Sequence, residues 1–297
     1  MQTLAQALDA GPVVLDGGLA TLLEARGHDL SSSLWSARLL LDDPAAVRGA
    51  HAAYLAAGAR VVTTASYQVS ATGFAAAGLD ADAAATALRR SVAVAREAVE
   101  AAGEGGPRWV AASVGPYGAA LADGSEYRGD DGLSVAQLRR WHRPRLQQLA
   151  AAGPDVLALE TVPSLAEAEA LLAEVAGTGV PAWLSLTAAG GRTRAGEPVE
   201  EAFAMARDVP EVVAVGVNCC DPAEVGGLAR LAAASGGRPV VAYPNSGEGW
   251  DAAARGWTGA PVPLPVAAWV AAGARLVGGC CRVGPQQVRQ VAAALAP

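Results

Sequence analysis

The sequence predicts an α/β fold, a (β/α)8 TIM barrel formed as a single domain by residues 1–297. Short apolar segments alternate with longer Ala-rich amphipathic segments, and this alternation occurs eight times along the chain. The apolar segments are mostly continuous, which is typical of parallel strands that are buried on both faces. Eight such units in 297 residues match a barrel of this type, whose usual size is about 250 residues.

Each expected strand is a short run of mostly apolar residues, and several of these runs end on a polar or acidic residue. Strands of a parallel sheet need no alternation of apolar and polar residues, because both of their faces are covered. The eight expected strands are residues 13–15, 61–66, 109–114, 156–161, 183–187, 212–218, 240–243 and 275–278.

A helical pattern follows each expected strand. The clearest helix start is Asp43-Pro44, a capping residue followed by a first-turn proline, and that helix ends at Ala57-Gly58. Ser164 and Glu167 have the spacing of a capping box at the start of another helix. The expected helices are residues 43–58, 81–102, 135–152, 165–176, 199–207, 223–234, 265–272 and 285–296.

The alternative architecture is a doubly wound open sheet. Its dinucleotide fingerprint, Gly-x-Gly-x-x-Gly, would follow the first strand, where this sequence has Asp16-Gly17-Gly18. Three connections are unusually long, and all of them follow strands: residues 16–42, 115–133 and 244–264. In a barrel these connections lie on the face where active sites are found, so we expect them to enclose a site.

The composition excludes several kinds of chemistry. All 22 basic residues are Arg, so the chain has no Lys, and it has only three His. Without lysine it cannot form a Schiff base with a substrate, anchor pyridoxal phosphate or supply a P-loop lysine. The formal net charge of −7 argues against a nucleic-acid partner. His51 and His142 fall within expected helices, so we expect neither to be catalytic.

No targeting or membrane segment is evident in the sequence. The N-terminus lacks a basic region and has Asp9 early, unlike a secretory signal. The longest uncharged runs, residues 61–79 and 256–274, contain Gly with Thr and Ser or with Pro, unlike a membrane span of about 20 apolar residues. We therefore expect a cytoplasmic protein with no membrane partner, and the sequence predicts no oligomeric state.

The four cysteines form two adjacent pairs, Cys219-Cys220 and Cys280-Cys281, at the ends of the sixth and eighth expected strands. These strand ends lie on the same rim of a barrel, so thiolates gathered there could bind zinc. Three protein ligands with an open fourth position would form a catalytic site, and four would form a closed structural site. The alternative is that these cysteines are small buried apolar residues.

Carboxylates occupy two other strand ends. Asp16 and Glu160 could each bind a substrate ammonium group through charge-assisted hydrogen bonds. The alternatives are a helix cap for Asp16 and a buried ion pair with Arg for Glu160. Thr64 and Ser66 lie on one face of their strand and could donate to a carboxylate, although Thr is also favoured in strands by propensity alone.

Three aromatic residues lie beside these strand ends. Trp35 is in the first long connection, and Tyr67 and Tyr243 follow or end strands. Their ring faces could attract a cationic methyl donor. Packing in the core is the commoner role for each of them.

Seven motifs together resemble the homocysteine S-methyltransferase family, over nearly the whole chain. The motif Tyr-Pro-Asn-Ser-Gly-Glu is similar to the branch that uses S-methylmethionine or S-adenosylmethionine, more than to the betaine branch. The motifs are Leu-Asp-Gly-Gly at 15–18, Thr-Thr-Ala-Ser-Tyr-Gln at 63–68, Gly-Pro-Tyr-Gly at 115–118 with Ala-Asp-Gly-Ser-Glu-Tyr-Arg-Gly at 122–129, Glu-Thr at 160–161, Gly-Val-Asn-Cys at 216–219, Tyr-Pro-Asn-Ser-Gly-Glu at 243–248 and Gly-Gly-Cys-Cys at 278–281.

The resemblance implies that Zn²⁺ is bound by Cys219, Cys280 and Cys281, and that Cys220 is not a ligand. It implies no catalytic residue beyond the zinc-activated thiol of the substrate. The partners would be homocysteine and a sulfonium methyl donor. Asp131 departs from the Tyr of the family pattern, on the donor side. The implied substrate-binding residues are Asp16, Gly17, Thr64 or Ser66, Glu160 and Asn218, with Trp35, Tyr67 and Tyr243 on the donor side.

Other functions remain open at this point. Within the family, the donor could be betaine, or the acceptor could be a selenium compound of the selenocysteine type. Outside it, the chain could be a non-methylating barrel with a structural zinc, or a thiol-based binding protein. The number of cysteines on one metal separates these possibilities, because four would indicate a structural site.

Overall fold

The computed structural model describes residues 2–32, 34–251 and 256–296. Eight parallel strands form one sheet in the order β1-β12-β9-β8-β5-β4-β3-β2. A parallel bridge between Leu15 and Val61 joins the first strand to the second and closes the sheet into a barrel. The predicted (β/α)8 barrel is confirmed. The strands are β1 (Val13–Val14), β2 (Val61–Thr63), β3 (Trp109–Val114), β4 (Val156–Val162), β5 (Ala182–Leu186), β8 (Val212–Asn218), β9 (Val240–Tyr243) and β12 (Ala274–Val277).

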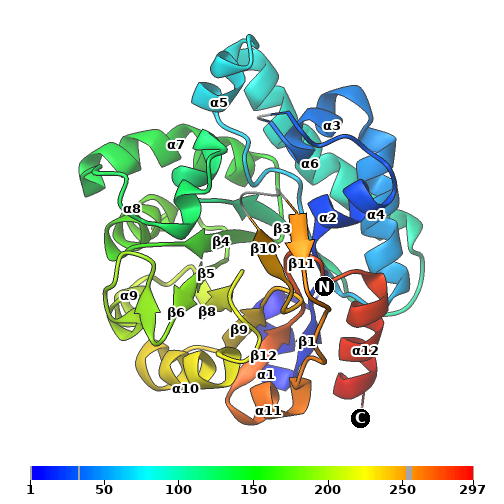
Figure 1. The fold of residues 1–297 in the computed structure, drawn as a ribbon, viewed down its shortest axis with the longest axis vertical. Coiled ribbons are helices and arrows are strands. Elements are labelled where there is room, and N and C mark those ends of the chain that lie inside the picture. Colours follow the sequence, from blue (N-terminus) through cyan, green and yellow to red (C-terminus); the bar gives the residue numbers. More distant parts are fainter. Residues whose placement is uncertain (1, 33, 252–255, 297) are drawn as a thin grey trace.

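Helices surround the strands (Figure 1). All eight expected helices are present, with ends shifted by a few residues. The Asp43 side chain caps its helix by accepting a hydrogen bond from the Ala46 amide, 3.1 Å away. The ring consists of α4 (Pro44–Ala56), α6 (Ala81–Ala101), α7 (Val135–Ala151), α8 (Leu165–Val175), α9 (Val199–Met205), α10 (Val225–Gly236), α11 (Val266–Ala271) and α12 (Pro285–Leu295).

The connections between strands and helices contain short elements that the sequence did not predict. The connection after β1 folds into two helices, and others contain 3-10 turns or two-stranded hairpins. Each is too short to show a clear period of apolar residues. These elements are α2 (Leu19–Ala25), α3 (Ser36–Asp42), α5 (Ala71–Ala76), η1 (Gly118–Leu121), η2 (Ser125–Tyr127), η3 (Ala206–Asp208), β6 (Ala188–Ala189) with β7 (Arg192–Thr193), and β10 (Gly249–Asp251) with β11 (Gly256–Thr258).

A further helix, α1 (Leu4–Ala10), closes one end of the barrel. Its buried residues Leu4 and Leu8 pack in one apolar cluster with interior side chains such as Val13 and Trp109. The Trp109 indole also donates to the Gln2 carbonyl oxygen, 3.2 Å away. Because this end is filled, the open space of the barrel lies at the carboxyl ends of the strands.

The apolar residues divide into two clusters. The larger one lies between the strands and the helices, and the smaller one fills the barrel interior. Interior positions combine small residues such as Ala111 and Ala158 with the large side chain of Trp183. This combination fills the tapering interior and leaves a solid floor beneath the strand ends. Among the described residues, no helix is long and apolar enough to cross a membrane.

Candidate active site

One cavity opens at the carboxyl ends of the strands, where a TIM barrel places its active site. Its walls come from residues at the ends of the strands and from the connections that follow them. Two predicted site residues, Ser66 and Asn218, are absent from its lining. The predicted residues that line it are Asp16, Gly17, Trp35, Thr64, Tyr67, Glu160, Cys219, Tyr243, Cys280 and Cys281.

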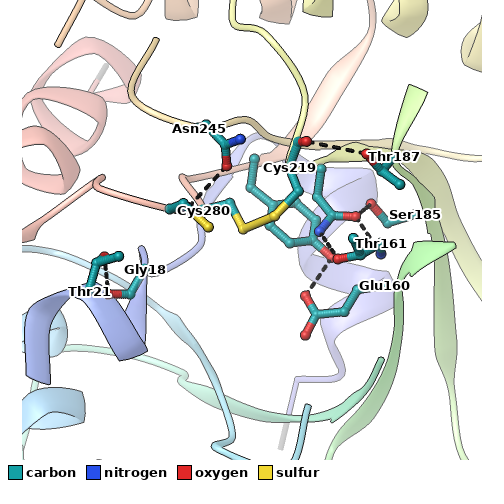
Figure 2. The surroundings of a disulfide bond; sticks show 12 residues. Gly18, Thr21, Glu160, Thr161, Ser185, Thr187, Cys219, Asn245 and Cys280 are labelled. Carbon is teal, nitrogen blue, oxygen red and sulfur yellow. Dashed lines mark hydrogen bonds between the residues drawn. A yellow bond between two sulfur atoms is a disulfide. The ribbon is translucent and has the colours of Figure 1, made fainter. Parts of the chain in front are cut away.

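Three cysteine sulfur atoms meet at this cavity. Cys219 follows β8, and Cys280 and Cys281 follow β12. All three sulfur atoms lie within 4.8 Å of one another. In the structure, Cys219 and Cys280 are joined as a disulfide, and Glu160 lies nearby (Figure 2). The strand ends therefore bring together the three cysteines that the family resemblance indicates.

The disulfide differs from the expected set of three thiolates. A thiolate is the metal-binding form of cysteine, so the disulfide must accept two electrons before Cys219 and Cys280 can bind a metal. Burial raises the pKa of the Cys281 thiol to about 12, so a nearby cation is needed to ionise it at neutral pH. Three clustered sulfur donors fit a soft metal such as zinc, with one ligand position left for a substrate.

Cys220 does not belong to this group. Its side chain is fully buried in the apolar cluster between strands and helices, and it does not line the cavity. Burial raises the pKa of its thiol to about 12. Cys219 has a φ of 48°, so the chain bends where it leaves β8, and the two neighbouring cysteines have different surroundings.

The segment after β9 holds both cysteine loops in place. The Cys280 amide donates to the Pro244 carbonyl oxygen at 2.7 Å, and the Cys281 amide donates to Asn245 Oδ1 at 3.2 Å. The Asn245 amide in turn donates to the carbonyl oxygen of Cys220 at 3.1 Å. The motif at residues 243–248 therefore positions the cysteines by hydrogen bonds to their backbone groups, and Asn245 bridges the two loops.

Paired glycines allow the loops after β1 and β12 to pack against each other. A Cβ atom on Gly17 would lie 2.2 Å from the Val283 carbonyl oxygen, and one on Gly18 would lie 2.5 Å from that of Cys280. The Gly279 amide donates to the Asp16 carbonyl oxygen at 2.9 Å. Gly17 was predicted to bind substrate. This close approach of two backbones requires a glycine at position 17, independently of any contact with a ligand.

Asp16 is a buried carboxylate held by Thr63. The Thr63 amide donates to Asp16 Oδ2 at 2.7 Å, and the Thr63 hydroxyl donates to Oδ1 at 3.0 Å. Burial raises the pKa of Asp16 to about 8, although the Thr63 hydrogen bonds favour the ionised form. Thr63 was not singled out from the sequence as a site residue, although it begins the motif at residues 63–68.

Glu160 is the second buried carboxylate of the cavity. It accepts hydrogen bonds from the Ser113 hydroxyl and from the Tyr243 hydroxyl, the latter at 3.1 Å. The Trp183 indole donates to the same Tyr243 oxygen at 3.0 Å, which fixes the phenol. Burial raises the pKa of Glu160 to about 7. Tyr243 was predicted on the donor side, and its hydroxyl is used here to orient Glu160.

Thr64 and Ser66 brace the strand that carries Ser113. Their hydroxyl oxygens are 2.7 Å apart, and the Ser66 hydroxyl donates to the Ser113 carbonyl oxygen at 2.7 Å. The Ser113 amide donates to Thr64 Oγ1 at 3.0 Å. Thr64 also lines the cavity, whereas Ser66 is enclosed behind it. These contacts fix Ser113, which in turn binds Glu160.

Asn218 supports a strained residue beside the cavity. Thr161 has φ 59°, in the left-handed region that a β-branched residue rarely adopts. Asn218 Oδ1 accepts a hydrogen bond from the Thr161 amide, and its Nδ2 donates to Thr161 Oγ1, both at 2.7 Å. Trp35 and Cys219, with φ of 50° and 48°, also line the cavity. Such strain is concentrated at functional sites.

The remaining wall comes from the connection after β3. Glu126 and Tyr127 of η2 line the cavity. Tyr67 and Trp35 line the same cavity. Neither η2 residue was singled out from the sequence as a site residue, although both fall within the motif at residues 122–129. The cavity thus has three carboxylates, three sulfur atoms and several aromatic side chains.

Comparison with known proteins identifies the family. The model of the family described as homocysteine S-methyltransferase matches residues 13–295. Homocysteine S-methyltransferase 4 of Zea mays is 46% identical, with 96% of this chain and 90% of the relative covered. The metallated form of the Escherichia coli homocysteine methyltransferase MmuM superposes with a TM-score of 0.85 at 40% identity, with 97% of this chain and 98% of that chain covered.

The oxidized form of the same E. coli enzyme gives the same TM-score, 0.85, at 40% identity, with 95% of this chain and 96% of that chain covered. Sequence, barrel and cysteine cluster agree with these matches. This chain belongs to the homocysteine S-methyltransferase family, a family of methyltransferase enzymes that act on small molecules.

Proposed function

We propose that residues 1–297 form one homocysteine-binding barrel domain that makes methionine, with zinc held by Cys219, Cys280 and Cys281. The methyl donor is S-methylmethionine, with S-adenosylmethionine as the alternative. One observation carries this proposal: three clustered cysteine sulfurs and two buried carboxylates line the same cavity. A thiol amino acid has a thiol at one end and an ammonium group at the other, and the cavity offers a partner for each.

The cysteine cluster supplies the thiol end of the site. Three protein sulfurs leave one tetrahedral position of zinc free for a substrate sulfur. Bound zinc lowers the pKa of a coordinated thiol and so keeps it as a nucleophilic thiolate at neutral pH. The metallated form of the E. coli neighbour supports a metal in this family.

The carboxylates supply the other end. Asp16 and Glu160 line the same cavity, and the charge of Glu160 raises the pKa of Asp16, so both carboxylates can attract one ammonium group. Thr63 and Tyr243 hold these carboxylates in fixed orientations. Two oriented anions fix the amino end of homocysteine, and its sulfur then faces the cysteine cluster.

The charge of the cavity favours a cationic donor. Among the described residues, its lining includes Asp16, Glu126 and Glu160 but no Arg or His. S-methylmethionine carries two positive groups and one negative group and so has a net positive charge, whereas betaine is neutral overall. The ring faces of Trp35 and Tyr67, which line the cavity, can attract the positive charge of a sulfonium group.

The reaction needs positioning more than proton transfer. The homocysteine sulfur forms a bond to the methyl carbon while the bond from that carbon to the donor sulfur breaks, and its electron pair stays on the donor sulfur. The leaving thioether is neutral and needs no proton. The chain has to hold two sulfur atoms in line around one carbon, which rigid strand ends are suited to do.

We expect amino-acid binding to release protons near neutral pH. The pKa of Asp16 is raised to about 8 and that of Glu160 to about 7, so both are partly neutral there, whereas an ammonium group binds the ionised form. The affinity for L-methionine, which has no thiol to ionise, should rise between about pH 6 and about pH 8. For each carboxyl group that must ionise, the rise is at most about tenfold per pH unit. Calorimetry in buffers of different ionisation enthalpy measures the released protons; none at about pH 6.5 would contradict this binding mode.

The test of the function is an assay of the reduced, zinc-loaded protein. Homocysteine is offered with S-methylmethionine, S-adenosylmethionine or betaine in turn, and methionine is measured. We expect turnover with S-methylmethionine above all. Turnover with betaine alone, or only with a selenium acceptor, would assign a different branch of the family. Stoichiometric zinc without any methyl transfer would refute the proposal and indicate a structural metal.

A further inference from the structure

Glu126 lines the active-site cavity from an element separate from the other two carboxylates. Asp16 and Glu160 stand at the ends of barrel strands, whereas Glu126 belongs to η2, in the connection between β3 and α7. The proposed reaction binds two substrates in this one cavity. The wall that carries Glu126 is therefore available to the second of them.

One oxygen of Glu126 lacks a hydrogen-bond partner. Its Oε2 atom is fully buried, and no donor of the described residues reaches it. Asp16 and Glu160, by contrast, each accept hydrogen bonds on both oxygens. An unmatched buried carboxylate oxygen is costly, and native structures keep few such atoms without a reason. Because Glu126 lines the cavity, a ligand there would supply the missing donor once the carboxylate turns toward it.

The turn that carries Glu126 is fixed before any ligand binds. Ser125 is buried, and its amide and hydroxyl both donate to Asp123 Oδ1. Gly118 packs so closely that a Cβ atom there would lie 2.6 Å from the Glu126 nitrogen. The Arg128 guanidinium forms its ion pairs with Asp123 and Asp130, on the exposed side of the turn. The backbone therefore holds Glu126 in place beside the cavity that it lines.

The chemistry of the missing donor points to an ammonium group. A carboxylate oxygen needs an N–H or O–H donor, and a sulfonium sulfur carries neither. Asp16 and Glu160 already serve the ammonium group of homocysteine in the proposed function, on which this inference rests. Amino-acid sulfonium donors bring a second ammonium group into the cavity. We infer that Glu126 binds the α-ammonium group of the methyl donor and so selects sulfonium donors that are amino acids.

This role gives Glu126 a specific effect on donor choice. A donor with the same sulfonium but no amino group would leave Glu126 Oε2 unmatched in the complex, as it is in the free protein. Such a donor would bind only through its sulfonium and its carboxylate. The two donors are discriminated because the Glu126 carboxylate loses its hydration through burial whichever of them binds. Only the donor with an amino group replaces the lost water with a hydrogen bond.

The test compares Glu126→Gln with the zinc-loaded parent protein and two matched donors. One is S-methylmethionine, and the other is 4-dimethylsulfoniobutyrate, which is the same molecule without its amino group. The KM for S-methylmethionine should rise about 10-fold to 100-fold in the variant, because a hydrogen bond between charged groups is lost. The KM of the amino-free sulfonium, or its inhibition constant where it gives no turnover, should be the same for both proteins. The KM for homocysteine should stay within about twofold.

The control variant is Asp130→Asn, which removes one negative charge from the same connection on its exposed side. It should leave both donor constants unchanged. Equal weakening of both donors in Glu126→Gln, an unchanged KM for S-methylmethionine, or a raised KM for homocysteine would each overturn the inference. The parent protein must first be shown to methylate homocysteine with S-methylmethionine. If it does not, the result refutes the proposed function rather than the role of Glu126.

Discussion

Replacing Cys280 by serine is expected to remove bound zinc and to slow methionine formation on the order of 10³-fold. The Cys280 sulfur lies with those of Cys219 and Cys281 in a single cluster, so its loss leaves only two protein sulfurs. A serine hydroxyl is a poor replacement, because it does not ionise at neutral pH and is a hard ligand. Zinc content and turnover are both measured under reducing conditions, since the Cys219–Cys280 disulfide would otherwise block binding in the parent protein.

The matched control is Cys220→Ser, the same substitution at the fourth cysteine. Cys220 is buried away from the cavity, so zinc and turnover should be retained. A buried hydroxyl in an apolar cluster should lower the free energy of unfolding by about 1–3 kcal/mol, which a urea titration measures. Loss of zinc from Cys220→Ser, or a full complement of zinc in Cys280→Ser, would mean that the metal is bound by a different set of cysteines.

Glu160→Gln should raise the KM for homocysteine about 10-fold to 100-fold and leave the KM for the donor within about threefold. Glu160 is buried and oriented by Ser113 and Tyr243, and the substitution removes the charge while keeping the shape. An amide also presents N–H donors, which cannot accept a hydrogen bond from an ammonium group. Steady-state kinetics with each substrate varied in turn gives both constants.

A substrate analogue separates this binding role from a structural one. 4-Mercaptobutyrate is homocysteine without its amino group, and it should be used equally well by the parent protein and by Glu160→Gln. Glu169→Gln, an exposed carboxylate on α8, serves as the charge control and should change neither constant. If Glu160→Gln weakened the analogue as much as homocysteine, Glu160 would support the cavity without contacting the ammonium group.

The barrel and the cysteine cluster were predictable because they depend on local patterns. Continuous apolar runs such as residues 156–159 mark buried parallel strands, and the polar residues that end those strands then lie on one rim. Cys219 and Cys280 are 61 residues apart, but Cys219 directly follows β8 and Cys280 comes just after β12 of the same barrel. Their proximity therefore follows from topology alone, without any knowledge of side-chain packing.

The supporting residues were not predictable, because their roles depend on the register between strands. Thr63 meets Asp16, and Ser113 meets Glu160, each across 47 positions of sequence. No local pattern marks such a pair, since Ser and Thr are common in strands and loops alike. Asn218 was predicted to bind substrate, and the structure adds a role that its motif does not reveal: its amide stabilises the strained backbone of Thr161.

The interlocked loops after β1 and β12 lie where the first and last strands of the barrel join. Asp16 comes from one side of this junction and Cys280 from the other, with Gly18 and Gly279 packed between them. Asp16 therefore joins the cysteine cluster only when β12 has paired with β1. Zinc held by Cys219, Cys280 and Cys281 would link the loops after β8 and β12, so the metal that serves the chemistry would also hold the last strand of the barrel in place.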